Sequence, residues 1–193
     1  SVVTPLEHAD GYSETLALMP HSYQPNDHSR IIGKLPTRGD AGLPEEGFVF
    51  CSFNQSYKIT PEIFDIWCRL LREVQGSMLL LLDPGEVAQS NLRREALNRD
   101  INSDRLVFAK QLPATEHLGR LQLADLALDT HPVNSHTTCA DALWAGVPLV
   151  TVIGETFAGR VAASLLTAVD LPELVSDSLD GYHDQALRLA TQS

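Results

Sequence analysis

One short stretch of the sequence places several polar side chains at the expected start of a helix. His136, Thr137 and Thr138 stand directly before a short apolar segment, and Asp141 follows one turn later. A helix N-terminus carries free backbone N–H groups and the positive end of the helix dipole, so it attracts phosphate groups. The threonine hydroxyls and the imidazole can add donors. Asp141 shares a helix face with both threonines, one turn from the phosphate position, where its carboxylate can accept from a ribose hydroxyl.

A plainer interpretation of this stretch is a capped helix. Ser135 or Thr137 would be the N-cap residue, and the negative charge of Asp141 would favour the helix dipole. This interpretation accounts for the whole stretch except His136, so other parts of the sequence must decide between the two.

A second polar group, residues 54–58 with the sequence NQSYK, follows an apolar, β-prone run. Only three lysines occur in the chain, so Lys58 in a loop after a strand is informative. Its ammonium can meet a phosphate as a point charge, and Gln55 can donate to the same phosphate. A solvated loop would also explain these residues.

A third group lies within residues 112–120, LPATEHLGR, after another apolar run. His117 and Arg120 are three residues apart, so they share a helix face. A flat imidazole and a flat guanidinium together suit stacking on a base and hydrogen bonding to it. The alternative is a surface pair between Glu116 and Arg120, which would contribute only about 0.3–0.5 kcal/mol.

The elements that position these groups follow from the hydrophobic pattern. Strands are expected over residues 47–53, 77–82, 105–109, 126–130 and 148–153. Helices are expected over residues 60–74, 87–100, 113–124, from about 137, and over 158–169 and 181–192. This alternation predicts an α/β, Rossmann-like domain over residues 47–193, with a parallel sheet and helices on both faces. Ligands of such sheets bind at the carboxyl ends of the strands, where all three polar groups lie.

Residues 1–46 have a different pattern. They are rich in Pro, Gly, His and Asp, and the only helical pattern is a short stretch around Tyr12–Leu18. We expect no separate core there and interpret the segment as a linker or the tail of a preceding domain. The chain begins without an initiator Met, which suggests a processed or excised piece.

The composition restricts the class of protein. The chain of 193 residues is 44% hydrophobic and carries a net charge of −11, which argues against non-specific binding to nucleic acid. No apolar run approaches the length of about 20 residues that a membrane span needs, and no secretory signal is present. The three cysteines fit no zinc or disulfide spacing. We therefore expect a cytoplasmic protein with no nucleic-acid and no membrane partner.

Several nucleotide-binding signatures are missing from the sequence. There is no GxGxxG fingerprint, no P-loop and no Asp-x-Asp motif that would hold a metal on a diphosphate. A bound pyrophosphate would therefore be met by Lys58 and backbone amides. We expect no metal ion and no cofactor.

Three longer segments resemble one family of enzymes. They are CSFNQSYKITPEIFDIWCRLLREVQGSMLLLL, EHLGRLQLADLALDTHPVNSHTTCADALWAGVPLVT and GETFAGRVAASLL. Together they resemble the C-terminal catalytic lobe of the O-linked N-acetylglucosamine (O-GlcNAc) transferases, which are protein glycosyltransferases of the GT-B type. The resemblance covers about residues 47–176, and residues 10–28 resemble the end of the preceding N-terminal lobe. We expect a bacterial homologue.

The resemblance implies a role for each polar group. Gln55 and Lys58 resemble the pair that binds the diphosphate of UDP, with Lys58 neutralising the departing UDP. The backbone at Leu112 resembles the segment that reads the uracil edge. His117 resembles the imidazole that stacks on uracil, and Arg120 resembles the guanidinium beside it.

The same resemblance assigns the stretch at the expected helix start. His136, Thr137 and Thr138 resemble the motif that wraps the phosphates and approaches the sugar, and Asp141 resembles the residue that holds the ribose. One departure is Ala114, which occupies the position of an expected ribose-side lysine.

The implied activity is inverting, metal-independent transfer of N-acetylglucosamine from UDP-GlcNAc to Ser or Thr hydroxyls of an acceptor protein or peptide. The tetratricopeptide repeats and most of the N-terminal lobe of the family are missing, and with them the expected catalytic base. We therefore expect a donor-binding half that is inactive alone. The alternatives are transfer of another sugar or to another acceptor, such as glucose to Asn, a nucleotide-sensing or scaffold module, and a flavodoxin-like interaction domain without a nucleotide.

Overall fold

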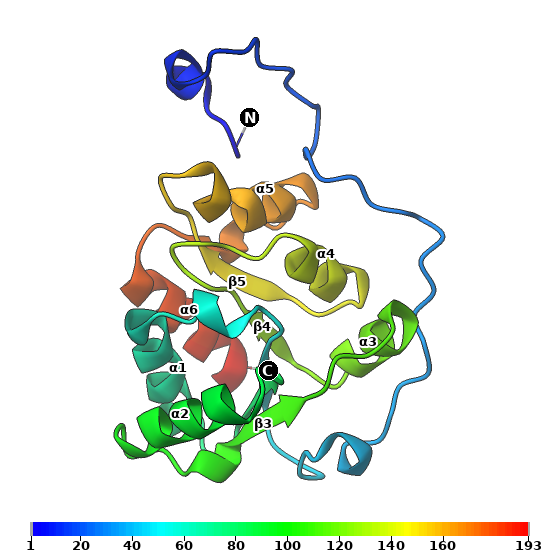
Figure 1. The fold of residues 1–193 in the computed structure, drawn as a ribbon, viewed down its shortest axis with the longest axis vertical. Helices are drawn as coiled ribbons and strands as arrows, with labels where there is room; N and C mark the ends of the chain where they lie inside the picture. Colours follow the sequence, from blue (N-terminus) through cyan, green and yellow to red (C-terminus); the bar gives the residue numbers. More distant parts are fainter. Residues whose placement is uncertain (1, 193) are drawn as a thin grey trace.

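The computed structural model describes residues 2–192, which form a six-stranded parallel sheet with flanking helices (Figure 1). The strands are β1 Val49–Ser52, β2 Met78–Leu82, β3 Leu106–Ala109, β4 Leu126–Leu128, β5 Leu149–Val152 and β6 Val175–Ser176. Their order is β3-β2-β1-β4-β5-β6, and all neighbouring pairs are parallel. The predicted α/β, Rossmann-like class is confirmed.

Helices cover both faces of this sheet (Figure 1). They are α1 Pro61–Glu73, α2 Glu86–Leu97, α3 Ala114–Leu121, α4 Thr137–Trp144, α5 Val161–Ala168 and α6 Leu179–Thr191. Helices α1 and α6 pack against each other on one face, whereas α4 contacts both α3 and α5 on the other. The central strands are buried on both faces, which explains their uninterrupted apolar sequences.

Helix α1 shows how local sequence sets these elements. The Thr60 hydroxyl accepts from the backbone N–H of Ile63 at 3.4 Å, and Pro61 occupies the first helical position, as predicted. The apolar stripe of α1 is buried, with Trp67 fully so.

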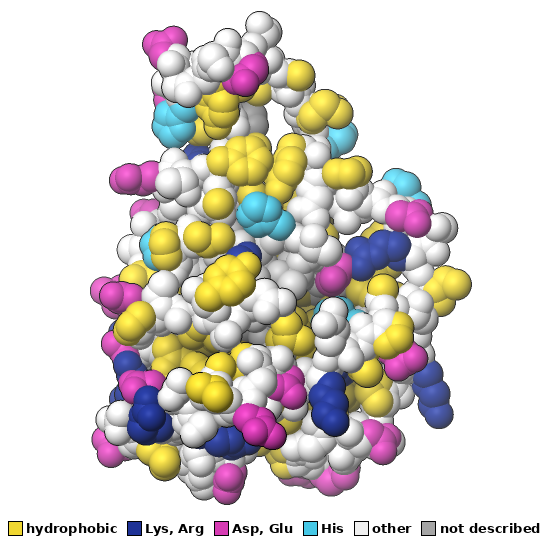
Figure 2. Space-filling view, viewed as in Figure 1, with side chains coloured by type: hydrophobic (Ala, Val, Ile, Leu, Met, Phe, Trp, Pro, Cys, Tyr) yellow, Lys and Arg dark blue, Asp and Glu magenta, His cyan; other side chains and the backbone are white. Residues whose placement is uncertain are grey.

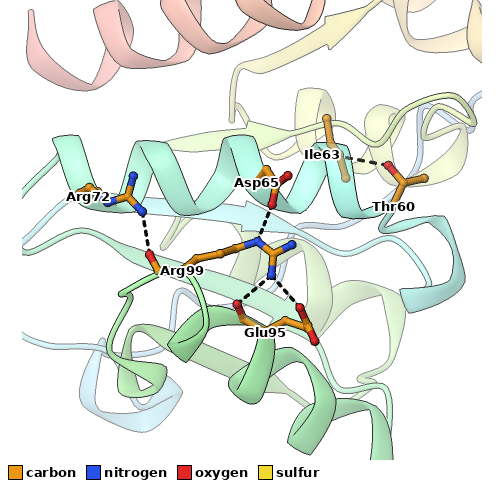
Figure 3. A network of polar contacts seen from close by, with 6 residues as sticks. All are labelled: Thr60, Ile63, Asp65, Arg72, Glu95 and Arg99. Atoms are coloured by element: carbon orange, nitrogen blue, oxygen red, sulfur yellow. Dashed lines mark hydrogen bonds and ion pairs between the residues drawn. The ribbon is translucent and has the colours of Figure 1, made fainter.

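Polar contacts also join α1 to the end of α2 (Figure 3). The Arg99 guanidinium donates to the Asp65 carboxylate on α1 and to the Glu95 carboxylate on α2, the latter at 2.7 Å. Arg72 donates to the carbonyl of Arg99 at 2.6 Å. Asp65 and Glu95 are more than two-fifths exposed. These ion pairs therefore help to orient α1 and α2 relative to each other more than they add to the free energy of unfolding.

Three predictions about local structure were wrong or incomplete. Residues 12–18 are not helical; the helical turn nearby is a 3-10 helix at Leu6–Gly11. Strand β6 was missed because two residues carry no readable periodicity. Helix α2 begins one residue earlier and ends three residues sooner than expected.

Residues 2–46 run as a largely extended segment along the outside of α5, α4 and α3 (Figure 1). The backbone N–H of Gly33 donates to the carbonyl of Thr115 at 2.9 Å, which fixes the segment to α3. A Cβ on Gly33 would lie 2.6 Å from that carbonyl oxygen, and one on Gly119 would lie 2.7 Å from the carbonyl oxygen of Lys34. Glycine at both positions therefore permits this close approach.

Two surface properties concern possible partners. None of the helices within residues 2–192 is both long and apolar enough to cross a membrane. On the face drawn in Figure 2, basic and acidic side chains are intermixed over the lower half rather than collected by sign.

Replacing Tyr182 by Phe tests a buried hydrogen-bond chain behind the sheet. The Tyr182 hydroxyl accepts from Trp67 Nε1 at 3.1 Å and donates to the carbonyl of Asp129 at 3.0 Å. Tyr182→Phe leaves both partners buried and unpaired, so the free energy of unfolding should fall by about 1–3 kcal/mol. Chemical denaturation measures this loss. The matched control is Tyr57→Phe, because Tyr57 is 82% exposed; equal stabilities of the two variants would contradict the role of this chain.

Candidate functional site

The centre of the sheet is the place where a ligand would bind in this fold. Strands β1 and β4 are neighbours, but the chain leaves β1 toward β2 and leaves β4 toward β5. Ligands of open α/β sheets bind beyond the carboxyl ends of strands at such a switch point. A small cavity there is lined by residues of β1, β4, β5, α3 and α4, and by Asn54 and Ser135 from the loops after β1 and β4.

A buried carboxylate organises the loop that follows β4. One oxygen of Asp129 accepts from the backbone N–H groups of Thr130 at 2.8 Å and of Ser135 at 2.7 Å, and from the Ser135 hydroxyl at 2.5 Å. Its other oxygen accepts from the Thr151 hydroxyl on β5 at 2.6 Å. These bonds fold residues 130–135 back onto the strand end and bring α4 over the sheet.

Burial raises the pKa of Asp129 to about 6, against the opposing effect of these four hydrogen bonds. The carboxylate is therefore charged at neutral pH, although only 1% of the residue is exposed. Sequence analysis did not select Asp129; the available signal was a carboxylate at the end of an apolar strand.

The capped-helix interpretation of α4 was wrong. The Ser135 hydroxyl donates to Asp129, and the N-cap position belongs to His136, whose side chain forms no cap hydrogen bond. No side chain within the described residues therefore caps the first turn of α4, and its leading N–H groups point to the carboxyl end of the sheet. This arrangement is suited to an anion.

Lys58 and Thr138 come together at that helix start. Lys58 Nζ donates to the carbonyl of Asn134 at 2.9 Å and lies 3.5 Å from Asn54 Oδ1. The Thr138 hydroxyl donates to the same Asn54 oxygen at 3.0 Å. Burial lowers the pKa of Lys58, and the charge of Asp129 opposes this effect. The predicted phosphate lysine thus lies beside the predicted phosphate helix.

The remaining residues predicted for the phosphate end differ in exposure. Gln55 and Thr137 are exposed, while His136 is partly buried. His136 Nδ1 lies 3.0 Å from the hydroxyl of Tyr23, which comes from the extended N-terminal segment. Burial and then the charge of Lys58 lower the pKa of His136, against an opposing effect of the Ala158 carbonyl. Its imidazole is therefore neutral at pH 7.

His117 and Arg120 form a second cluster, with Phe53 at the end of β1. Arg120 Nη2 lies 2.9 Å from His117 Nδ1, and its guanidinium stands 4.8 Å from the centre of the Phe53 ring. The Phe53 and His117 rings meet edge to face at 4.8 Å. Burial lowers the pKa of both His117 and Arg120.

This cluster overturns the interpretation of Arg120 as a surface residue. Arg120 is 6% exposed and donates to the carbonyl of Lys110 at 2.6 Å, whereas Glu116 is exposed. The positions of His117 and Arg120 fit a surface on which a flat ring could stack. The contacts of Arg120 with the Lys110 carbonyl and the Phe53 ring hold the two side chains in place. Leu112, in the loop between β3 and α3, is 36% exposed.

Asp141 lies on the buried side of α4 and is paired with a residue that sequence analysis did not select. Its carboxylate accepts from the Arg30 guanidinium. Arg30 belongs to the extended segment, 111 positions earlier. No periodic pattern marked Arg30 or Tyr23 in the sequence, so only the folded chain identifies them.

A parallel sheet in this order, with a cationic helix start at its switch point, defines a Rossmann-like α/β lobe. Residues 34–193 match the model of glycosyl transferase family 41, and the chain belongs to this family. The fold is that of the C-terminal lobe of its GT-B members.

Named relatives support this assignment. The chain is 40% identical over 195 residues to a probable UDP-N-acetylglucosamine–peptide N-acetylglucosaminyltransferase, SEC, of Arabidopsis thaliana, covering 97% of this chain and 20% of that protein. It is 41% identical over 159 residues to the UDP-N-acetylglucosamine–peptide N-acetylglucosaminyltransferase of Caenorhabditis elegans, covering 82% of this chain and 14% of that protein. The chain thus spans a fifth or less of these relatives.

A solved structure extends the similarity to three dimensions. A mutant of the Thermobaculum terrenum O-GlcNAc transferase superposes with a TM-score of 0.88 at 33% identity, covering 99% of this chain and 36% of that one.

The pH dependence of stability tests the burial of Asp129. Its pKa is about 6 in the folded chain against an ordinary value of 3.8, so the folded state binds the extra proton between these values. The stabilising contribution of the neutral carboxyl is complete below about pH 4 and is lost as the pH rises through 6. The free energy of unfolding relative to Asp129→Asn should therefore fall by the order of 3 kcal/mol between pH 4 and 7. Denaturant titrations of both proteins measure it, and a constant or rising difference would contradict the assignment.

Proposed function

We propose that this chain is the donor-binding half of an inverting, metal-independent glycosyltransferase that moves N-acetylglucosamine from UDP-GlcNAc to Ser or Thr hydroxyls of proteins. The observation that carries the proposal is Lys58, whose ammonium rests on the Asn134 carbonyl beside the uncapped start of α4. Membership of the family and the names of the relatives support the choice of sugar and acceptor.

Each end of the site would hold one part of the donor. The diphosphate would lie against the first turn of α4, with Lys58, Gln55 and the hydroxyls of Thr137 and Thr138 as donors. His136, neutral at pH 7, would approach the sugar.

The nucleoside would occupy the other end of the site. The uracil would stack on His117 beside Arg120, with its edge at the backbone of Leu112. Its ribose would contact Asp141.

The chemistry would be mainly electrostatic. As the acceptor oxygen attacks the anomeric carbon, the bond from that carbon to the β-phosphate oxygen breaks and negative charge builds on the phosphate. Lys58 and the N–H groups of α4 are already placed before that charge forms, so they stabilise the transition state without reorganising. No metal ion or cofactor has a role in this proposal.

The proposal leaves one step to another part of the protein. The base that takes the acceptor proton would come from a preceding N-terminal lobe, for which residues 1–46 are the proposed tail, and tetratricopeptide repeats would precede that lobe. The complete enzyme would be cytoplasmic.

Calorimetric titration of this chain with UDP is the first test. We expect saturable binding with one site, because the diphosphate-binding and base-stacking groups are all within this lobe. No heat of binding at millimolar UDP would contradict the proposal and favour an interaction domain without a nucleotide.

Replacing Lys58 by Met in the complete protein separates catalysis from binding. Turnover should fall by about a hundredfold or more, because a group that stabilises the leaving diphosphate acts mainly in the transition state. UDP affinity should fall by much less. Lys34→Met is the matched control, since Lys34 is exposed. Wild-type turnover in the Lys58 variant would contradict the role of Lys58.

The product identifies the sugar and the acceptor. Mass spectrometry of an acceptor peptide incubated with the complete protein and either UDP-GlcNAc or UDP-glucose should show one added N-acetylhexosamine on Ser or Thr. A hexose on Asn would establish the alternative transferase. Tight UDP binding without any transfer would instead indicate a sensing module.

A further inference from the structure

An ion pair joins the extended N-terminal segment to the nucleotide-binding lobe. The Arg30 guanidinium donates to the Asp141 carboxylate, and the two side chains are only 20% and 13% exposed. The pair lies close enough to His117 for both charges to act on its pKa, which Asp141 raises and Arg30 lowers. Arg30 therefore lies at the end of the site where His117 and Asp141 meet.

The backbone of this segment is held at Arg30 and again three residues later. Trp144 Nε1 on α4 donates to the carbonyl of Arg30 at 3.3 Å. Three residues later, Gly33 is bonded to α3 through the carbonyl of Thr115 at 2.9 Å. Since the chain is fixed to α4 and then to α3, the position of Arg30 is part of the fold rather than a chance surface contact.

The charges around the site indicate what this ion pair contributes to binding a diphosphate. A UDP diphosphate is polyanionic, and the side-chain ammonium at the start of α4 is that of Lys58, which already has the buried carboxylate of Asp129 nearby. An unpaired carboxylate on α4 would add a second negative charge one turn from the phosphates and repel them. Arg30 cancels that charge.

We infer that Arg30 is part of the UDP-sugar-binding site and neutralises the charge of Asp141. This carboxylate can then accept hydrogen bonds from the ribose hydroxyls without repelling the diphosphate. The inference rests on the proposed function, because it concerns the same site. It assigns to residues before position 34 a part in nucleotide selection. The site should then favour phosphorylated nucleosides over the free nucleoside partly through a residue outside the sheet.

The ratio of UDP affinity to uridine affinity isolates this effect. Both ligands contain the base and the ribose, so a change in ribose contacts weakens both and cancels in the ratio. Only UDP carries the phosphate charge. We would measure both affinities for the folded chain at low ionic strength, with calorimetry for UDP and an NMR titration for uridine.

Four variants give distinct expectations. In Arg30→Gln the ratio should fall at least fivefold, because Asp141 is left uncompensated. In Asp141→Asn it should rise about threefold, because Arg30 is left as an unpaired cation. The double variant should return within twofold of the wild type. Arg94→Gln, on the exposed face of α2, should leave the ratio unchanged.

The outcomes separate this inference from the proposed function. A wild type that binds UDP while Arg30→Gln and Asp141→Asn leave the ratio unchanged would overturn the role of Arg30 and keep the donor site. A wild type that binds no UDP would overturn both. If Arg30→Gln does not fold, Asp141→Asn decides alone: a higher ratio supports the inference and an unchanged or lower ratio overturns it.

Discussion

The arrangement of the site depends on one buried charge, the carboxylate of Asp129 at the end of β4. A charged group with 1% exposure is tolerated only when donors surround it, and the donors here are two backbone N–H groups and two hydroxyls. Satisfying that charge folds residues 130–135 back on themselves. The same fold removes Ser135 from the cap of α4, and it presents the carbonyl of Asn134 to Lys58. One desolvated group therefore produces an uncapped helix start and places a lysine beside it.

The extended segment before the sheet adds side chains to the candidate site that the lobe itself does not supply. Its backbone follows the outside of α5, α4 and α3 (Figure 1). It contributes Tyr23 beside His136 and Arg30 beside Asp141. Both contacts reach polar side chains at the start or on the buried side of α4. Ala114 occupies the position of the lysine that the family resemblance suggested, and Arg30 supplies a positive charge beside Asp141. The candidate site is thus assembled from parts of the chain more than a hundred residues apart.

The sequence predicted the sheet well because its strands are apolar runs separated by helices with clear caps and stripes, as at Thr60 and Pro61. It also indicated that Lys58, His117 and the start of α4 would meet, since parallel strands end at one edge. Strand β6 was not predicted because its two residues are too few to show a hydrophobic pattern. Tyr23 and Arg30 could not be found, because an extended segment has no periodicity and its contacts depend on tertiary packing.

The central claim is that the diphosphate of a nucleotide binds where the start of α4 meets Lys58. A crystal structure of this chain with UDP tests it most directly. We predict phosphate oxygens within hydrogen-bond distance of Lys58 Nζ and of the backbone N–H groups of Thr137 and Thr138, with the ribose against Asp141. A UDP molecule bound elsewhere, such as the groove that residues 21–28 form with α4 and α5, would contradict the account.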